Sequence, residues 1–202
     1  MDIQIGLRIG HKRIEAVVLK NGAEPELSEH VVLEQTDEKP LVEVLREMAD
    51  RFDGVGARWS VGLPSEEFSF RLLSFPFKNR RAIASAVPFE LEGLLPYPSE
   101  SFVSAHEIIS TSDGSATVLA CAIRKERLDY YTDAIKEAGI EPSIITPDAV
   151  PLAYLYRRFL QPEGGDGPAI IADVNDTTML ICYVGDAGQL DYTGAEPDER
   201  VL

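Results

Sequence analysis

Residues of the kinds that carry catalysis are scattered along the chain and are not grouped at catalytic spacing. His11, His30 and His106 are far apart and lack the spacing of metal ligands. Glu90 and Glu92 are two residues apart on a predicted helix, so their carboxylates point in different directions. Serine, histidine and aspartate residues occur, but the sequence alone gives no triad geometry. We therefore predict neither a metal site nor a catalytic constellation here, and two polar turns remain as candidates.

The first candidate is the turn in IGLRIGHKRIEAVVL, at residues 5–19. It contains Gly10, His11 and Lys12 and follows Arg8. The cations Arg8 and Lys12 can attract a phosphate by charge. The alternative is that they are ordinary surface or strand-edge cations.

The second candidate is the turn in IADVNDTTML, at residues 171–180. It follows Asp173 and contains Asn175, Thr177 and Thr178. These residues are also what an ordinary hairpin turn contains. The two turns together indicate a possible repeat of a strand-turn-strand unit.

Hydrophobic periodicity predicts the elements that position the first turn. Apolar residues at every second position indicate strands at 3–9, from 14 and at 30–34. Helical spacing of apolar residues predicts a helix at 41–52, followed by a strand at 58–63.

The middle of the chain begins with a strand at 68–75 and continues with a helix that Asn79 caps and that runs toward Leu95. Its apolar stripe consists of Ile83, Val87, Leu91 and Leu94. Pro88 interrupts this stripe and is expected to kink the helix.

The remaining elements include a hairpin around Asp113 and Gly114. We further predict a helix at 125–138, a strand at 143–146, a helix capped by Thr146 or Asp148 that ends at Leu160, a linker at 161–168, and strands at 169–174, 179–184 and 189–192.

The duplicated strand-turn-strand units resemble those that open each lobe in the actin, Hsp70 and sugar-kinase superfamily. In that superfamily the turns offer backbone N–H groups to nucleotide phosphates, and nearby carboxylates hold magnesium through water.

A more specific resemblance lies in FPFKNRRAIASAVPFELEGLLPYP, at residues 75–98. This segment is similar to the hallmark of the cytoplasmic part of the type II secretion L protein (GspL) and less closely to the type IV pilus protein PilM. Residues 118–156 are also similar to both families. The resemblance implies an α/β (α+β mixed-sheet), actin-like and RNase H-like fold with an FtsA-type inserted subdomain.

The family arrangement implies three parts. The first lobe would contain residues 1–65 and 144–166, the inserted subdomain 66–143, and the beginning of a second lobe 167–202. We expect this second lobe to be truncated, because full-length L proteins continue to a transmembrane helix that is absent from this chain.

The same resemblance implies a degenerate nucleotide site. Active members carry an aspartate where this chain has Arg8, and an arginine is cationic and cannot replace a magnesium-positioning acid. His11 and Lys12 replace small residues, and Asn175 stands where glycine is usual. The degenerate phosphate-loop positions are therefore Arg8, Gly10, His11, Lys12, Asp173, Asn175 and Thr178, and we expect no cofactor and no catalytic activity.

Composition narrows the class of partner. The net charge of -15 at pH 7 and the pI near 4.6 argue against binding to nucleic acid or to anionic lipid. No apolar run approaches the length of a membrane span, and Cys121 and Cys182 read as reduced, buried thiols of a cytoplasmic protein. Residues 24–53 hold ten acids, which form either a solvated face or a docking surface for a basic partner.

Three functional hypotheses follow. The first, implied by the L protein, is a non-enzymatic scaffold that binds the N-terminal domain of the secretion ATPase and other inner-membrane platform proteins. The second is a PilM-like, ATP-binding type IV pilus assembly protein. The third is a small-molecule kinase of the same superfamily, and Arg8 argues against it.

Overall fold

The computed structural model describes residues 2–21, 26–52, 56–160, 167–174, 179–185 and 190–195. The chain forms two compact units, Met1–Pro64 with Leu128–Asp148 and Ser65–Arg127 with Ala149–Leu202. Each unit has its own sheets and its own buried side chains. The division into two lobes and an insert that the family resemblance implies is a different partition, and it stays a prediction.

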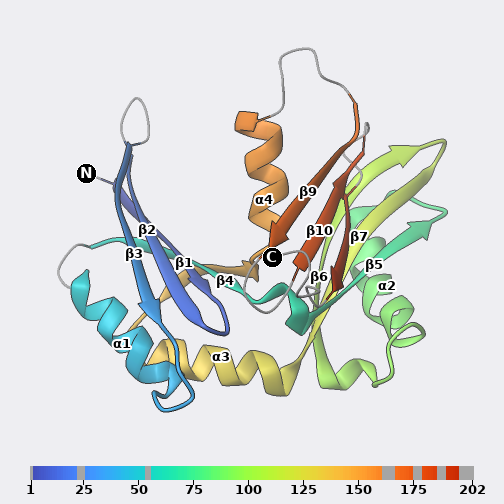
Figure 1. Cartoon of the computed structure of the whole chain (residues 1–202). Helices are drawn as coiled ribbons and strands as arrows, with labels where there is room; N and C mark the ends of the chain where they lie inside the picture. Colours follow the sequence, from blue (N-terminus) through green and yellow to red (C-terminus); the bar gives the residue numbers. More distant parts are fainter. Residues whose placement is uncertain are drawn as a thin grey trace. The chain divides into compact units, whose positions relative to one another are not determined.

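The first unit contains a five-stranded sheet with the order β3-β2-β1-β4-β8 (Figure 1). Its strands are β1 (Asp2–Ile9), β2 (Arg13–Asn21), β3 (Glu26–Glu34), β4 (Arg58–Leu63) and β8 (Pro142–Pro147). β1, β2 and β3 form an antiparallel meander, whereas β4 runs parallel to both β1 and β8. The predicted alternation of β1 is confirmed, because Ile5, Leu7 and Ile9 are almost completely buried.

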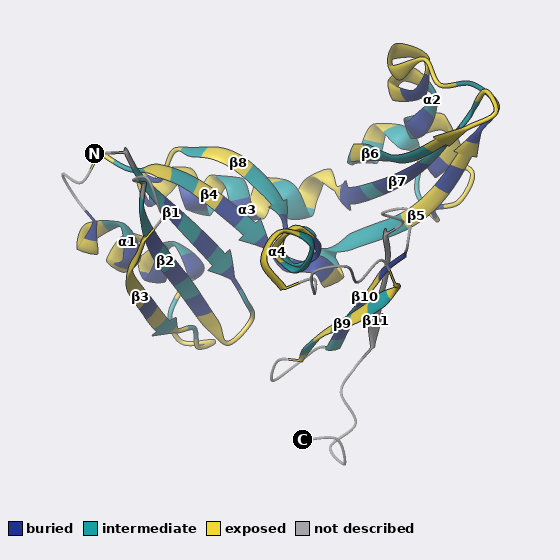
Figure 2. Cartoon of the chain, turned by 90° about the horizontal axis from the view of Figure 1, so that it is seen from above, coloured by how far each residue is buried: buried dark blue, intermediate teal, exposed yellow. Residues whose placement is uncertain are grey.

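Two helices lie on one side of this sheet, α1 (Leu41–Arg51) and α3 (Lys125–Glu137), as Figures 1 and 2 both show. The predicted stripe of α1 is confirmed, with Val44, Leu45 and Met48 fully buried. Helix α3 ends before Gly139, whose φ of 77° is a left-handed conformation that glycine adopts without steric cost.

The second unit contains an antiparallel sheet with the order β5-β7-β6 and one helix packed against it. The elements are β5 (Phe68–Phe75), α2 (Arg80–Glu92), β6 (Phe102–Ser112) and β7 (Ser115–Arg124), with short 3-10 turns at Ser65–Glu67 and Ser99–Ser101. Ile83, Val87 and Leu91 of α2 pack on Phe75 and Val118 of the sheet. The predicted hairpin between β6 and β7 is confirmed, and Asp113 and Gly114 both have positive φ, as its two-residue turn requires.

A second sheet of this unit has the order β11-β10-β9. Its strands are β9 (Ala169–Val174), β10 (Met179–Val184) and β11 (Leu190–Ala195). Helix α4 (Val150–Leu155) contributes Ala153 to a core with Leu180 and Cys182 of β10. The helix continues as a π-helical turn at Tyr156–Leu160, so the prediction that it runs through Leu160 is confirmed.

Two local predictions are wrong, one at the start of α4 and one at the end of α2. Figure 2 colours both helices by burial. Asp148 and Thr146 do not cap α4, because the residue at its N-terminal boundary is Ala149 and no side chain caps it. Leu94 is half exposed because α2 ends at Glu92, and the chain then turns so that Leu95 is buried in its place. Pro88 lies inside α2, and the kink stays a prediction.

The Asn79 cap of α2 gives a test of local stability. Its Oδ1 accepts hydrogen bonds from the backbone N–H groups of Arg81 and Ala82, each at 3.0 Å. Asn79→Ala should lower the free energy of unfolding by about 1 kcal/mol, because two N–H groups lose their acceptor. Asn79→Asp keeps the acceptor and should stay within about 0.5 kcal/mol of the parent. Urea unfolding followed by circular dichroism measures the free energy of unfolding of both variants. Equal losses of stability in the two would show that the missing cap acceptor is not the cause of the destabilisation.

Candidate functional site

The carboxyl ends of three parallel strands, β1, β4 and β8, meet at one edge of the first sheet. Arg8 near the end of β1 is in register with Gly62 of β4, which is in register with Thr146 of β8. In open α/β sheets ligands commonly bind beyond the carboxyl ends of such strands. This edge is therefore the place where the chemistry of the first unit is expected.

An ion pair occupies this edge. Nε of Arg8 donates a hydrogen bond to Oδ2 of Asp148 at 2.9 Å, although the two residues are 140 positions apart in sequence. The Asp148 side chain is 10% exposed and the Arg8 side chain 33% exposed. A carboxylate so far removed from water needs a compensating cation, and Arg8 supplies it from the neighbouring strands.

The backbone around Asp148 fixes its side chain at this place. Its N–H donates to the carbonyl oxygen of Leu63 at 2.8 Å, which extends the pairing of β8 with β4 by one residue. A Cβ on Gly62 would lie 3.2 Å from Cβ and 3.3 Å from Cα of Asp148. Glycine at position 62 therefore lets Asp148 approach β4 closely enough to meet Arg8.

Two backbone groups of the turn between β1 and β2 are hydrogen-bonded within the first unit. The N–H of Gly10 donates to the carbonyl oxygen of Arg13 at 3.0 Å, and the carbonyl oxygen of Lys12 accepts from the N–H of Gln35 at 2.8 Å. A Cβ on Gly10 would lie 2.9 Å from that same Arg13 oxygen, so the turn closes too tightly for a larger residue. An amide that is already bonded inside the hairpin does not point at a phosphate.

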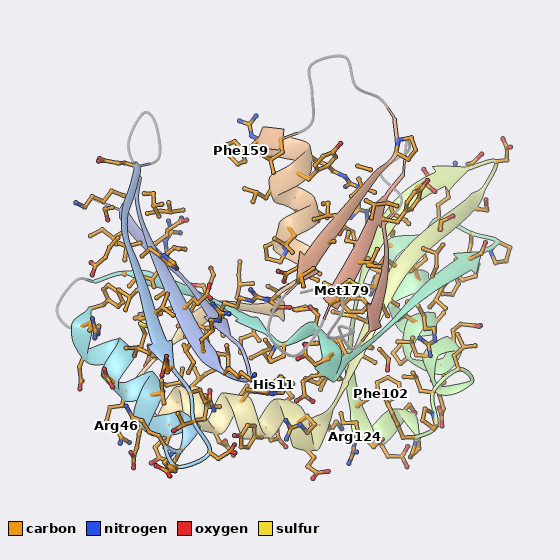
Figure 3. All side chains as sticks on the ribbon, in the orientation of Figure 1. His11, Arg46, Phe102, Arg124, Phe159 and Met179 are labelled. Carbon is orange, nitrogen blue, oxygen red and sulfur yellow. The ribbon has the colours of Figure 1, made fainter. Side chains whose placement is uncertain are left out.

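The side chains of His11 and Lys12 are exposed at the tip of this hairpin, where Figure 3 labels His11. Asp173 lies in β9, in register with Leu180, and belongs to the second compact unit. Asn175, Thr177 and Thr178 lie outside the described residues. The structure thus brings Arg8 together with Asp148, and the role of the other predicted positions stays a prediction.

Sequence reasoning missed Asp148 and Gly62 as members of this site. Asp148 was expected to act only as a helix cap. The signal that would have found it is its position directly after β8, since an acid at the carboxyl end of a parallel strand faces the edge where ligands bind.

Three other features of the described part of the chain bear on known kinds of functional site: metal-ligand clusters, cysteines and long apolar helices. In that part, no cluster of three or more His, Cys, Asp and Glu side chains is arranged to hold a metal ion. Cys121 and Cys182 are not disulfide-bonded; Cys182 is buried, and burial raises the pKa of Cys121. A protonated thiol is a weak nucleophile, so Cys121 has no feature of a reactive cysteine. Among the described helices, none is both long and apolar enough to cross a membrane.

The sequence profile of the family described as type II secretion system (T2SS), protein L, matches residues 27–155, which is well over half of the chain. The chain belongs to this family. The matched region includes the segment at 75–98 and Asp148, but it begins after Arg8 and the β1–β2 turn. The resemblance found in the sequence is confirmed. No curated protein matches the chain by sequence.

Solved structures show that this L-family chain has the actin-like ATPase fold. The PilM-PilN type IV pilus biogenesis complex matches with a TM-score of 0.82 and 18% identity over 98% of this chain. The cytoplasmic domain of EpsL of Vibrio cholerae, an inner-membrane component of the type II secretion system, matches with a TM-score of 0.68 and 16% identity over 96%. A Bacteroides thetaiotaomicron protein with an actin-like ATPase fold gives 0.62 and 13% identity over 98% of the chain. The chain spans 62%, 71% and 71% of the length of these three, respectively.

The Arg8–Asp148 pair can be tested by removing one charge. Arg8→Met keeps an unbranched side chain but leaves the Asp148 carboxylate without this cation, so the free energy of unfolding should fall by about 1–3 kcal/mol. Asp148→Asn should cost less, because the Arg8 guanidinium can turn to water, and the double variant should cost less than the sum of the two.

Arg13→Met is the matched control, because Arg13 lies on the same hairpin and its 3.8 Å pair with Glu15 is more exposed. Its loss should be within about 0.5 kcal/mol. Chemical denaturation of all four variants measures these values, and equal losses for Arg8 and Arg13 would show that the buried carboxylate does not depend on Arg8.

Proposed function

We propose that this chain is a non-enzymatic assembly module of the type II secretion inner-membrane platform. In this role it acts at the cytoplasmic face of the bacterial inner membrane, contacts other platform proteins and recruits the cytoplasmic secretion ATPase through that ATPase's N-terminal domain. The observation that carries the proposal is the match of residues 27–155 to the L-protein family. The fold shared with the cytoplasmic domain of EpsL supports the same role.

The Arg8–Asp148 pair supports the non-enzymatic part of the proposal. A magnesium ion is held by carboxylates and water. At this edge the carboxylate of Asp148 already meets a guanidinium at 2.9 Å. The Arg8 guanidinium is part of the same chain and does not depend on binding from solution. A magnesium ion would have to displace it from Asp148 and also lose some of its own bound water.

The acidic face of the first unit is a candidate for the ATPase contact. Glu26, Glu29 and Glu34 are exposed along the edge strand β3. Nearby on α1, Glu47 meets Nζ of Lys39 at 2.6 Å and Arg51 at 3.6 Å, and its hydrogen bond and charge interaction with Lys39 lower its pKa. The three acids of β3 make no such ion pair with any described residue, so they are open to a basic partner, and a merely solvated face stays the alternative.

The recruitment proposal is tested by titrating the chain with the isolated N-terminal domain of the secretion ATPase from the same organism. Calorimetry should give a dissociation constant at or below tens of micromolar. Charge reversal at Glu26, Glu29 and Glu34 together should weaken binding about tenfold or more if β3 is the docking surface.

The control reverses three acids of the second unit, Glu90, Glu92 and Glu100, and should leave the affinity within about twofold. If both triple variants bind the ATPase domain with equal affinity, the acids of β3 are a solvated face and not the docking surface. No binding by the parent chain would contradict the recruitment itself.

A PilM-like, ATP-binding pilus assembly protein is the second candidate, and the TM-score of 0.82 to the PilM-PilN structure favours it. Thermal unfolding with and without Mg-ATP separates the two, since a ligand that binds the folded state raises the melting temperature by mass action. For a scaffold we expect no saturable rise in the full-length protein. A saturable rise would favour the PilM-like function, and magnesium-dependent turnover would revive a kinase.

A further inference from the structure

Strand β6 leaves one edge of its sheet open. It pairs with β7 from Phe102, labelled in Figure 3, to Ser112, and it stands at the end of the order β5-β7-β6. Within the described part of the chain, no backbone hydrogen bond reaches the other side of this strand. An open edge presents N–H and C=O groups that another extended chain can pair with.

Other sheet edges of the chain carry residues that discourage such pairing. Edge strand β3 carries three exposed glutamates, and edge strand β8 begins and ends with Pro142 and Pro147. In its eleven residues β6 has no proline, lysine, arginine or aspartate, and its single acid is Glu107. β6 thus carries fewer residues that oppose strand addition than either edge strand of the first unit, β3 or β8.

Both faces of β6 are held by packing. Ile108 packs against the core that α2 shares with the sheet, whereas Ile109 packs against the core around α4 and β10. A strand fixed on both faces loses little further conformational entropy when its edge pairs with a peptide, which favours binding at the edge.

A hollow of about 270 Å³ lies against the same strand, lined by Arg80, His106, Glu107 and Ile108. Glu107 accepts a hydrogen bond from the hydroxyl of Tyr154, whose pKa is raised by burial and by Glu107, so this acid is engaged with α4. Arg80 is exposed and, in the part of the chain that the structure describes, makes no ion pair.

Arg80 brings a positive charge to the hollow of an otherwise acidic protein, and two more cations lie close to it in sequence. Lys78 and Arg81 flank Arg80 in sequence, and both are exposed and make no ion pair with any described residue. Charges beyond about 8–10 Å are largely screened at physiological ionic strength, so the net charge of -15, which is spread over the whole chain, does not cancel the positive charge of Arg80 at the hollow.

We propose that the β6 edge binds an extended segment of a partner protein by strand addition, with an acidic side chain of that segment facing Arg80. The main-chain hydrogen bonds would supply affinity, and Arg80 would select an acidic over a basic segment. The proposal rests on the scaffold function for the nature of its partner. A second copy of this chain fits less well, because its own β6 edge would bring the same cations to the contact.

The test selects random displayed peptides of about a dozen residues on the intact chain, which are long enough to cover the regular portion of β6 before its register shift or the whole strand. Enriched peptides should carry Asp or Glu, bind at micromolar concentration by fluorescence polarisation, and slow hydrogen exchange of β6 amides but not of β5 amides. N-methylation of every second peptide amide on the pairing edge should abolish binding, while methylation on the opposite edge should not.

Arg80→Glu should weaken these peptides about tenfold or more, because it replaces the selecting cation with a like charge. Arg71→Glu is the matched control: it makes the same charge change on β5, the opposite edge strand, and should stay within about twofold.

Failure to enrich acidic peptides, equal effects of the two variants, or protection of a strand other than β6 would overturn the proposal. So would a dimer in sedimentation that Arg80→Glu strengthens and that peptides cannot displace, since the occupant would then be a second copy. The selection does not use the secretion ATPase, so its failure leaves the recruitment titration standing, and the reverse also holds.

Discussion

A carboxylate that is nine-tenths removed from water must have a cation beside it, and the first unit of this chain is arranged around that requirement. Asp148 follows β8, and Arg8 reaches it at 2.9 Å from β1, one strand beyond β4. The approach needs the register of three parallel strands and the missing side chain of Gly62. The ion pair therefore links segments that are 140 residues apart, and it lies at the edge at which an α/β sheet commonly binds ligands.

The carboxyl edge of such a sheet can bind a ligand or metal ion, or it can hold an internal ion pair that stabilises the fold. The charges of the side chains at the edge decide between these two roles. Two acids at the ends of neighbouring strands repel each other and are stabilised by a bound metal ion or a shared proton, whereas one acid and one arginine neutralise each other. Membership in the type II secretion L family and the actin-like fold are compatible with either outcome, because a fold does not fix a function. In this chain the edge carries one acid and one arginine, because Arg8 pairs with Asp148.

The sequence predicted what depends on local periodicity and capping. The alternation at Ile5, Leu7 and Ile9 and the Asn79 cap are both in the structure, because burial and N–H satisfaction act over a few neighbouring residues. The partner of Asp148 lies 140 residues away in sequence. Reasoning from neighbouring residues therefore predicted only that this acid caps the start of α4. Leu94 shows the same limit, since the end of α2 broke a stripe that the sequence pattern continued.

In the proposed assembly role, the chain must leave some backbone open for partners while avoiding pairing with itself, and β6 combines features that serve both needs. Its register with β7 shifts between Ile108 and Ser110, and such a bulge bends the strand and interrupts a regular edge. The regular portion before the bulge is long enough for a short extended segment but offers less to another long strand. Arg80 and its basic neighbours further disfavour a second copy, since two such edges would bring like charges together. The bulge and the cations therefore act in the same direction: they narrow the occupants of β6 to short, acidic segments.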